Sequence, residues 1–341
     1  MKRVVIIGAS FAGLSAYLGL RNLDLDVTLF DAKPHFEYVP GLHEAINDDQ
    51  RLHQLRIDLS KHYKNVFIHA TVNNITSKYV YANGKKYPYD YLIIATGAKT
   101  NWYGNEHFKH HLHQFKTGEH VQAINKQLPK AKTVTVVGGG YTGVEVASVL
   151  AGLPKRINIV HAGPRLLHTM PKSISNRVHK YFKQHHIHMY LNDPLIKCST
   201  RSLTLRSGTT LSSDLTIYSA GIAPNDDLLG KHTLTSHLNI SKRPNIFLCG
   251  DVARSGILST AHNAMIEGRH VARQIAHHLK TDRYINIAHR NWTTLAIALG
   301  KQWGIIPVGP INLYMPFVGL SKKIIEKRVL FEFKNKKRLP V

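Results

Sequence analysis

The chain has 341 residues, of which 43% are hydrophobic, so it is long enough for two or three domains that each bury a core. Its two cysteines, Cys198 and Cys249, exclude a disulfide scaffold. Lysine and arginine outnumber the acidic residues by 45 to 21, and the net charge of +24 favours polyanions such as nucleic acid, anionic lipid or phosphorylated ligands. Because these charges are spread along the chain and not gathered with aromatic residues in one tract, we expect no specific nucleic-acid partner.

The chain begins with a β-branched run over 4–7, a glycine-rich turn and a helix over 14–23. The turn contains Gly8 and Gly13, with Ser10 in place of the middle glycine of the dinucleotide-binding pattern. Such a turn brings the backbone and a helix N-terminus close to a pyrophosphate. A second strand over 26–30 ends in Asp31, where an acid can accept hydrogen bonds from a ribose hydroxyl. These features predict a dinucleotide-binding unit.

The same arrangement returns about 130 residues later. A strand over 134–137 leads into a turn with three glycines, Gly138, Gly140 and Gly143. The strand that follows ends in His161 instead of an acid, and Arg165 comes four residues later, where it can attract a 2′-phosphate. We therefore expect NADPH to be accepted alongside NADH.

Between and after these units lie further elements. A strand over 91–94 ends in Ala95-Thr96-Gly97, a polar, histidine-rich connector covers 101–120, and hairpin-like material covers 198–211. The second unit ends near Gly221. A last strand, over 245–249, ends in Gly250-Asp251 and precedes a helix over 262–278.

Taken in order, these motifs resemble the two-dinucleotide-binding flavoprotein superfamily of pyridine-nucleotide oxidoreductases. The resemblance implies an α/β fold with two Rossmann-like domains and a small C-terminal element. It implies a discontinuous FAD domain (1–106 and 245–290), an NAD(P)H domain inserted between (107–244), and an element for membrane or interface contact at 291–341. It assigns Asp251 to the ribityl chain and phosphate of the flavin, and a helix N-cap at the same residue is compatible with that role.

The stretch 33–42 contains no thiol, which separates the chain from the disulfide reductases of this superfamily. Its Phe36-Glu37-Tyr38 and Pro40-Gly41 are similar to the type II NADH:quinone oxidoreductases and the apoptosis-inducing-factor-like quinone reductases. This resemblance implies hydride transfer from NADH or NADPH to FAD, and electron transfer to a quinone without a disulfide relay. Further cofactor-binding residues implied by the resemblance are Lys33, Pro40, Ala95, Thr96, Gly97, Gly221, Gly250 and Ala261. No metal is implied.

Two residues are candidates for catalysis. Glu145 matches the acid that lies near nicotinamide and flavin in this family, but an acid in a first helical turn is also favoured by the dipole. The family carries Thr-Ala-Gln where this chain has Thr260-Ala261-His262. His262 can hydrogen-bond a quinone or relay a proton, or it can be one of many surface histidines. Two other functions stay open: reduction of a small electron-carrier protein, and redox-gated binding of polyanions.

The tail differs in composition from the rest of the chain. Residues 303–320 are uncharged, but their prolines and glycines forbid a continuous helix, so we expect a loop or short strands. Residues 321–341 are basic and amphipathic, which suits an anionic membrane surface, while a strand or helix completing the core or a homodimer is the alternative. If the tail only docks on lipid, truncation after Leu320 leaves flavin reduction intact. The first strand starts at Arg3 and leaves no room for a signal peptide, so we expect a cytoplasmic protein, peripheral on the inner face of the cell membrane if the tail binds lipid.

Overall fold

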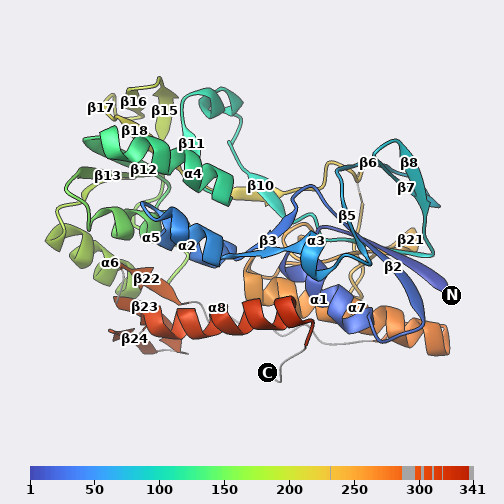
Figure 1. Ribbon diagram of the computed structural model, residues 1–341. Coiled ribbons are helices and arrows are strands. Elements are labelled where there is room, and N and C mark those ends of the chain that lie inside the picture. The colour runs from blue at the N-terminus through green and yellow to red at the C-terminus, as the bar shows by residue number, and fades with distance from the viewer. Residues whose placement is uncertain (231, 286–295, 301–302, 309–310, 317, 338–341) are drawn as a thin grey trace.

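A computed structural model describes residues 1–341 except 231, 286–295, 301–302, 309–310, 317 and 338–341. Two twisted, mainly parallel sheets lie side by side in Figure 1, and one long C-terminal helix runs beneath both. The predicted α/β class is confirmed. The expected boundary at 290–291, together with Gly309 and Pro310 of the tail, lies outside the described residues.

The first sheet has the strand order β20-β21-β9-β1-β2-β5, and its strands are parallel except for β20. These strands are β1 (Lys2–Ile7), β2 (Leu25–Asp31), β5 (Phe67–His69), β9 (Tyr91–Ile94), β20 (Asn239–Ile240) and β21 (Arg243–Leu248). Strand β21 pairs with β9 although all strands of the second sheet lie between them in sequence. The first sheet is therefore built from two separate parts of the chain.

Side chains of alternate residues in β1 lie on opposite faces of this sheet, as the two-residue period of a strand requires. Val4 and Ile6 pack in the cluster that contains α1 (Phe11–Leu20) and α7 (Ala261–Thr281). Val5 and Ile7 pack in the cluster under the small sheet β6-β7-β8. Helices α1 and α7 touch closely because Gly268 has no side chain, since a Cβ there would collide with the carbonyl oxygen of Ala12.

The second sheet has the order β11-β18-β12-β13-β14, and all of its neighbours are parallel. Its strands are β11 (His113–Gln114), β12 (Thr133–Val137), β13 (Arg156–His161), β14 (His188–Leu191) and β18 (Leu215–Tyr218). The helices of this unit are α4 (Gly118–Gln127), α5 (Tyr141–Leu150) and α6 (Lys172–Gln184). The stretch 101–120, expected as a connector, supplies β11 and the start of α4. Its residues His113 and Gln114 form β11 by pairing with β18.

Shorter elements fill the ends of the two sheets. They are β3 (His35–Glu37), β4 (Arg56–Asp58), β6 (Val72–Ile75), β7 (Tyr79–Ala82), β8 (Lys85–Pro88), β10 (Ala98–Thr100), β15 (Leu195–Cys198), β16 (Ser202–Leu205), β17 (Thr210–Ser212), β19 (Ile222–Pro224), α2 (Asp49–Gln54), α3 (Leu59–His62), and the 3₁₀ turns η1 (Val39–Ala45), η2 (Glu106–His110) and η3 (Leu128–Lys130). The predicted hairpin is confirmed, since β16 and β17 are antiparallel and Gly208 supplies the positive φ between them. Strands β10 and β19 pair where the chain crosses between the sheets.

The tail forms an antiparallel sheet, β22 (Ile297–Leu299), β23 (Trp303–Val308) and β24 (Ile311–Met315), followed by α8 (Val318–Asn335). The expected short strands are confirmed. No helix within the described residues has the length and apolarity needed to cross a bilayer. In Figure 1, α8 begins at β22–β24 and ends near α1 and α7.

Helix α8 buries one face against the rest of the protein. The ring of Phe333 is fully buried and packs edge-on against Phe36 at 5.0 Å between centroids. Tyr63 donates a hydrogen bond to the Phe333 carbonyl at 2.6 Å. Two buried glutamates of α8 hold ion pairs, Glu326 with Arg51 at 2.5 Å and Glu332 with Arg269 at 2.9 Å. Truncation after Leu320 would therefore remove core residues, and the expectation that it spares flavin reduction is abandoned.

Candidate functional site

A single cavity of about 1230 Å³ runs between the two sheets, at the carboxyl ends of their parallel strands. Ligands of open α/β sheets bind at this edge, and ordinary small-molecule pockets measure roughly 300–1,000 Å³. The cavity is thus large enough to hold two cofactors. Most of the predicted residues line it: Gly8, Ser10, Asp31, Lys33, Pro40, Ala95, Thr96, Gly97, Gly140, Glu145, His161, Gly221, Gly250, Asp251 and Ala261.

The first glycine turn (residues 8–13) is shaped by contacts that exclude side chains. Gly8 has φ +104°, and a Cβ on it would collide with the carbonyl oxygen of Ala95. A Cβ on Gly13 would collide with the carbonyl oxygen of Gly8, so Gly13 brings α1 close to β1 and does not line the cavity. The turn therefore presents the N-terminus of α1 to the cavity, as a pyrophosphate requires.

Asp31 closes this turn from the end of β2. One carboxylate oxygen accepts a hydrogen bond from Ala9 N–H at 2.7 Å, and the other accepts one from Lys33 N–H at 2.8 Å. Burial raises the pKa of Asp31 although these hydrogen bonds oppose the rise. These two hydrogen bonds fix the carboxylate at the edge of the cavity, directly after β2.

The second glycine turn (residues 138–143) repeats this geometry. Gly138 has φ +115°, and a Cβ on it would meet the carbonyl oxygen of Ser219 at 2.5 Å. A Cβ on Gly143 would collide with the carbonyl oxygen of Gly138. Gly138 and Gly143 act through backbone geometry and helix packing, and neither lines the cavity.

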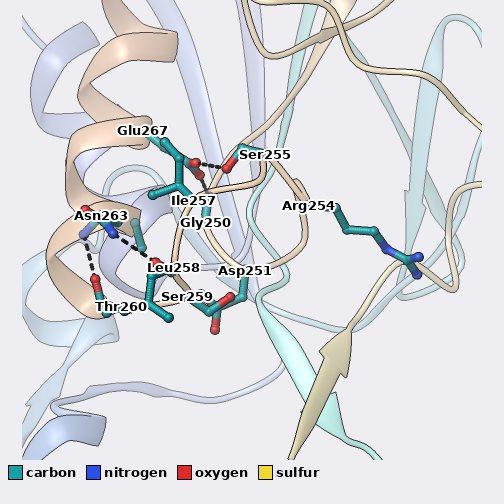
Figure 2. A pocket seen from close by; sticks show the side chains of 11 residues that line it. Gly250, Asp251, Arg254, Ser255, Ile257, Leu258, Ser259, Thr260, Asn263 and Glu267 are labelled. Carbon is teal, nitrogen blue, oxygen red and sulfur yellow. Dashed lines mark hydrogen bonds between the residues drawn. The ribbon is translucent and has the colours of Figure 1, made fainter. Parts of the chain in front are cut away.

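The loop after β21 carries Asp251 into the cavity (Figure 2). Glu267 of α7 ties the loop down by accepting hydrogen bonds from Gly250 N–H at 2.6 Å and Ser255 Oγ at 2.5 Å. Burial raises the pKa of Asp251, and the positive charge of Lys116 counteracts the rise. Burial lowers the pKa of Lys116 in turn. The Asp251 carboxylate faces the cavity beside one cation, an arrangement that suits the hydroxyls and phosphate of a flavin cofactor.

A buried charge cluster lies where α5, η1 and α8 meet the cavity. Lys322 Nζ donates to Glu145 Oε1 at 2.6 Å, and His43 Nδ1 lies 3.6 Å from Glu145 Oε2. The backbone N–H of Ala298 also donates to Glu145 at 3.0 Å. Burial alone would raise the pKa of Glu145, but Lys322 and His43 outweigh it and hold that pKa below its usual range.

His43 is the member of this cluster with a buried ring nitrogen that lacks a hydrogen-bond partner among the described residues. Its side chain is 3% exposed, and its Nε2 is buried without a hydrogen-bond partner among the described residues. Burial lowers its pKa, so the imidazole is neutral at ordinary pH. It lines the cavity together with Glu145 and Lys322, so three groups able to hold a proton meet at one point.

Two predicted side chains lie away from the cavity. His262 is exposed on the first turn of α7 and does not line the cavity, so the geometry gives no support to a catalytic role for it. Arg165 turns its guanidinium onto two backbone carbonyls, of Leu167 at 3.3 Å and His168 at 2.7 Å. It holds a loop in place and does not line the cavity.

The basic side chains His43, Lys116, His168 and Lys322 line the cavity and are among the lining residues that the sequence analysis does not identify. Each is a single residue outside any recognised motif, in a chain with 23 histidines and many lysines. Only their position in space separates them from the surface residues of the same types.

The thiols have no catalytic geometry. Cys249 borders the cavity but is fully buried, and burial raises its thiol pKa well above the usual value. Cys198 belongs to β15 and does not line the cavity, and both cysteines are free. A reactive thiol needs a depressed pKa and access, so a dithiol relay has no basis here.

Similar proteins agree with this geometry. Apoptosis-inducing factor homolog B of Dictyostelium discoideum is 26% identical, over 97% of this chain and 95% of its own. A type II NADH:quinone oxidoreductase of Staphylococcus haemolyticus is 22% identical, over 97% and 96%. The structure of NDH2 from Plasmodium falciparum in complex with NADH superposes with a TM-score of 0.86 at 18% identity, covering 98% of this chain and 96% of that one.

The family match covers residues 2–268, which hold both glycine turns and the Gly250-Asp251 loop. Members of this family use FAD, and the cradle of Gly8, Asp31 and Asp251 fits that cofactor. The chain belongs to the pyridine nucleotide-disulphide oxidoreductase family and is an NAD(P)H-dependent flavoprotein oxidoreductase.

Proposed function

We propose that the protein is an NAD(P)H:quinone oxidoreductase that works without a disulfide relay. FAD, when bound, accepts a hydride from NAD(P)H and returns two electrons to an acceptor. The first glycine turn, Asp31 and Asp251 hold FAD, and the second glycine turn holds the nicotinamide dinucleotide. We propose the domain division 1–106 with 245–290, and 107–244, on the same grounds.

The observation that carries the quinone acceptor is the buried cluster of Glu145, His43 and Lys322. A quinone takes up two protons with its two electrons, whereas a one-electron carrier protein takes up none. Ionisable groups held within hydrogen-bond reach of a reacting oxygen supply such protons. His43 and Lys322 reach the cavity from η1 and α8, and Glu145 holds both in place.

The walls beside this cluster suit an apolar ring. Val39, Pro40 and Leu42 of η1 line the cavity with Ala296 and Ile297 of the tail. Val39 is 40% exposed, so the apolar wall reaches the protein surface. Quinone-reducing relatives at 22–25% identity support the same acceptor.

The test is an anaerobic experiment in two steps on the FAD-loaded protein. NADPH or NADH should bleach the visible flavin absorbance, and a short-chain quinone should restore it in the same mixing experiment. A ferredoxin- or rubredoxin-type carrier in place of the quinone should restore it at least tenfold more slowly. A carrier protein that restores the absorbance faster than any quinone would replace the proposed acceptor.

We also propose that α8 places the protein on an anionic membrane surface. Its outward side chains combine apolar Leu320, Ile324 and Phe331, at 57%, 61% and 49% exposure, with exposed basic residues. The basic residues are Lys323, Lys327, Arg328 and Lys334. Apolar insertion plus attraction to headgroups is the usual basis of such binding. A homodimer formed through this face is the competing explanation, and it would show in the oligomeric state.

A further inference from the structure

His43 lies where the two units of the protein meet at the cavity. It belongs to η1 of the first unit, and its Nδ1 lies 3.6 Å from Oε2 of Glu145, in α5 of the second unit. Helix α5 begins within the second glycine turn, so Glu145 lies beside the proposed nicotinamide dinucleotide. Pro40 and Leu42 place the same 3₁₀ turn on the cavity wall. Because hydride transfer requires the two cofactors to touch, His43 borders the space in which they meet.

The imidazole of His43 has one nitrogen without a partner. The side chain is 3% exposed, and Nε2 is buried with no hydrogen-bond partner among the described residues. The carboxylate of Glu145 favours the neutral tautomer with its hydrogen on Nδ1, which leaves a lone pair on Nε2. A buried polar atom without a partner is costly and calls for an explanation. A site that holds a proton during only part of the reaction explains it, because a proton needs no open volume beside the ring.

The charged groups around this imidazole carry one more negative than positive charge. Glu145 and Lys322 form one ion pair, at 2.6 Å. Arg51 of α2 lies 2.8 Å from Glu44 of η1 and 2.5 Å from Glu326 of α8. Three carboxylates therefore face two cations, and a protonated imidazole would balance them.

The other polar groups packed around η1 are uncharged. Helix α4 contributes Asn125, whose amide donates to the carbonyl of Ala45 at 2.9 Å. Burial, with the neighbouring glutamates, raises the pKa of Tyr38, so its hydroxyl keeps its proton. Burial is also the main influence on His43 and lowers its pKa, although Glu145 opposes this. The ring is therefore neutral near pH 7, and the excess negative charge persists.

Hydride transfer changes this balance, because a hydride brings two electrons and only one proton into the cavity. We propose that His43 takes up one proton from solvent each time NAD(P)H reduces the bound FAD, and that it keeps this proton in the cavity wall until the electrons leave. The added negative charge favours the protonated form of a buried imidazole. With a quinone as acceptor, this proton is one of the two that the quinone takes up. The inference rests on the proposed positions of FAD and NAD(P)H and not on the identity of the acceptor.

Anaerobic mixing of the FAD-loaded protein with NADPH or NADH tests this with no acceptor present. Hydride transfer from one cofactor to the other exchanges no proton with solvent. A pH-indicator dye in weakly buffered solution therefore reports any proton that is taken up besides the hydride. At pH 7.5 about one proton should disappear from solution for each FAD that is reduced. Addition of NADP⁺ to the oxidised protein, which controls for nucleotide binding, should cause no uptake.

Substitutions test whether His43 holds this proton. His43→Gln and His43→Asn should each abolish the uptake, measured per FAD that is reduced. His53→Gln replaces an exposed imidazole of α2 outside the cavity and should retain it. Retained flavin absorbance reports that each variant is folded.

A measurement on the wild-type protein does not depend on these variants. Infrared difference spectra between the oxidised and the reduced protein, recorded with isotope-labelled histidine, should show neutral imidazole bands replaced by imidazolium bands. No proton uptake by the wild-type protein, an uptake that the His43 variants retain, or no histidine signal would overturn the proposal. None of these results bears on quinone reduction, because no acceptor is present. Conversely, a protein that takes up the proton but reduces a carrier protein faster than any quinone would lose only the proposed acceptor.

Discussion

Lys322 and Glu145, 177 residues apart in sequence, form an ion pair of 2.6 Å at the edge of the cavity. Each residue lies one turn into its helix, Glu145 in α5 and Lys322 in α8, and each side chain is less than 15% exposed. The pair connects the dinucleotide unit to the C-terminal helix. It also lowers the pKa of Glu145, the carboxylate that holds His43 and Lys322 in place.

Replacing Lys322 by methionine should slow quinone reduction at least tenfold, within the usual range for loss of an acid–base group. The pKa of Glu145 should rise, because Lys322 is the main influence that offsets its burial. The acid limb of the pH profile for the quinone step should therefore move to higher pH. Ferricyanide, which needs no protons, should be reduced at nearly the wild-type rate. Lys323→Met, at the exposed neighbour, is the control, and an equal loss with both acceptors would contradict the assignment.

Asp251→Asn should weaken FAD binding by about tenfold or more, because a hydrogen bond to a charged group contributes roughly 1.5–3 kcal/mol. The substitution keeps the shape of the side chain but leaves the partly buried Lys116 without its counter-charge. The measurement is the ratio of flavin to protein after dialysis. Asp282→Asn, at a side chain that is 97% exposed, should retain full flavin content. Full retention by both variants would remove Asp251 from the flavin site.

Phe333→Ala should lower the free energy of unfolding by about 3–5 kcal/mol, the usual loss for a buried phenylalanine. The ring is fully buried against Phe11 and Phe36, so its removal leaves a cavity under α8. Phe331→Ala lies two residues away on the outer face and should change the same quantity by no more than about 0.5 kcal/mol. Urea unfolding of the two variants checks the comparison. Similar losses would mean that α8 is packed on both faces.

Serine at Leu320, Ile324 and Phe331 together should release the protein from anionic vesicles without changing flavin reduction by NAD(P)H. The wild-type protein should also be released by high salt, because exposed charges are screened over about 10 Å at 0.1 M. Co-sedimentation measures both effects. Ile196→Ser, at an exposed apolar residue of β15, serves as the control. If the triple variant bound the vesicles as well as the wild type, the outer face of α8 would not be a membrane-binding surface.

Glu119 should contribute to stability at neutral pH and lose that contribution in acid. Burial would raise its pKa, but hydrogen bonds involving Lys33, Thr117 and the start of α4 lower it to about 2 from 4.5. A depressed folded-state pKa means that the stability is present above about pH 4.5 and is lost as the pH falls toward 2. Because the side chain is half exposed, the effect should be small and sensitive to salt.

The check is the difference in melting temperature between wild type and Glu119→Gln. It should be positive at pH 7, should shrink as the pH falls below about 4.5, and should approach zero only near pH 2. Glu106→Gln replaces an exposed glutamate of η2 that lies away from Lys33 and Arg56, and it should show no such trend. A difference that is independent of pH would exclude the ion pairs of Glu119 as its source.

Much of the cofactor architecture could be predicted from the sequence because its signals are local. A glycine turn between a buried strand and a helix requires particular residues at fixed spacing, so Gly8, Gly13, Gly138 and Gly143 are recognisable without a structure. Asp31 and Asp251 follow strands directly, and the carboxyl ends of parallel strands meet at one edge of a sheet. Both residues line the cavity, in agreement with that reasoning. Their individual roles stay predictions.

The chemistry at the edge of the cavity was decided by tertiary packing. His43, Lys116, His168 and Lys322 belong to no motif, and they converge because η1, the start of α4, the loop after β13 and α8 fold around one cavity. Tertiary packing also places His262 outside the cavity, although it stands at a motif position. Arg165 instead donates hydrogen bonds to backbone carbonyls of the loop that follows β13. Sequence spacing determines what a strand and the adjoining turn can bind. Which distant side chains share that space depends on long-range packing, as with α8, whose buried stripe follows from contacts with Arg51, Tyr63 and Arg269.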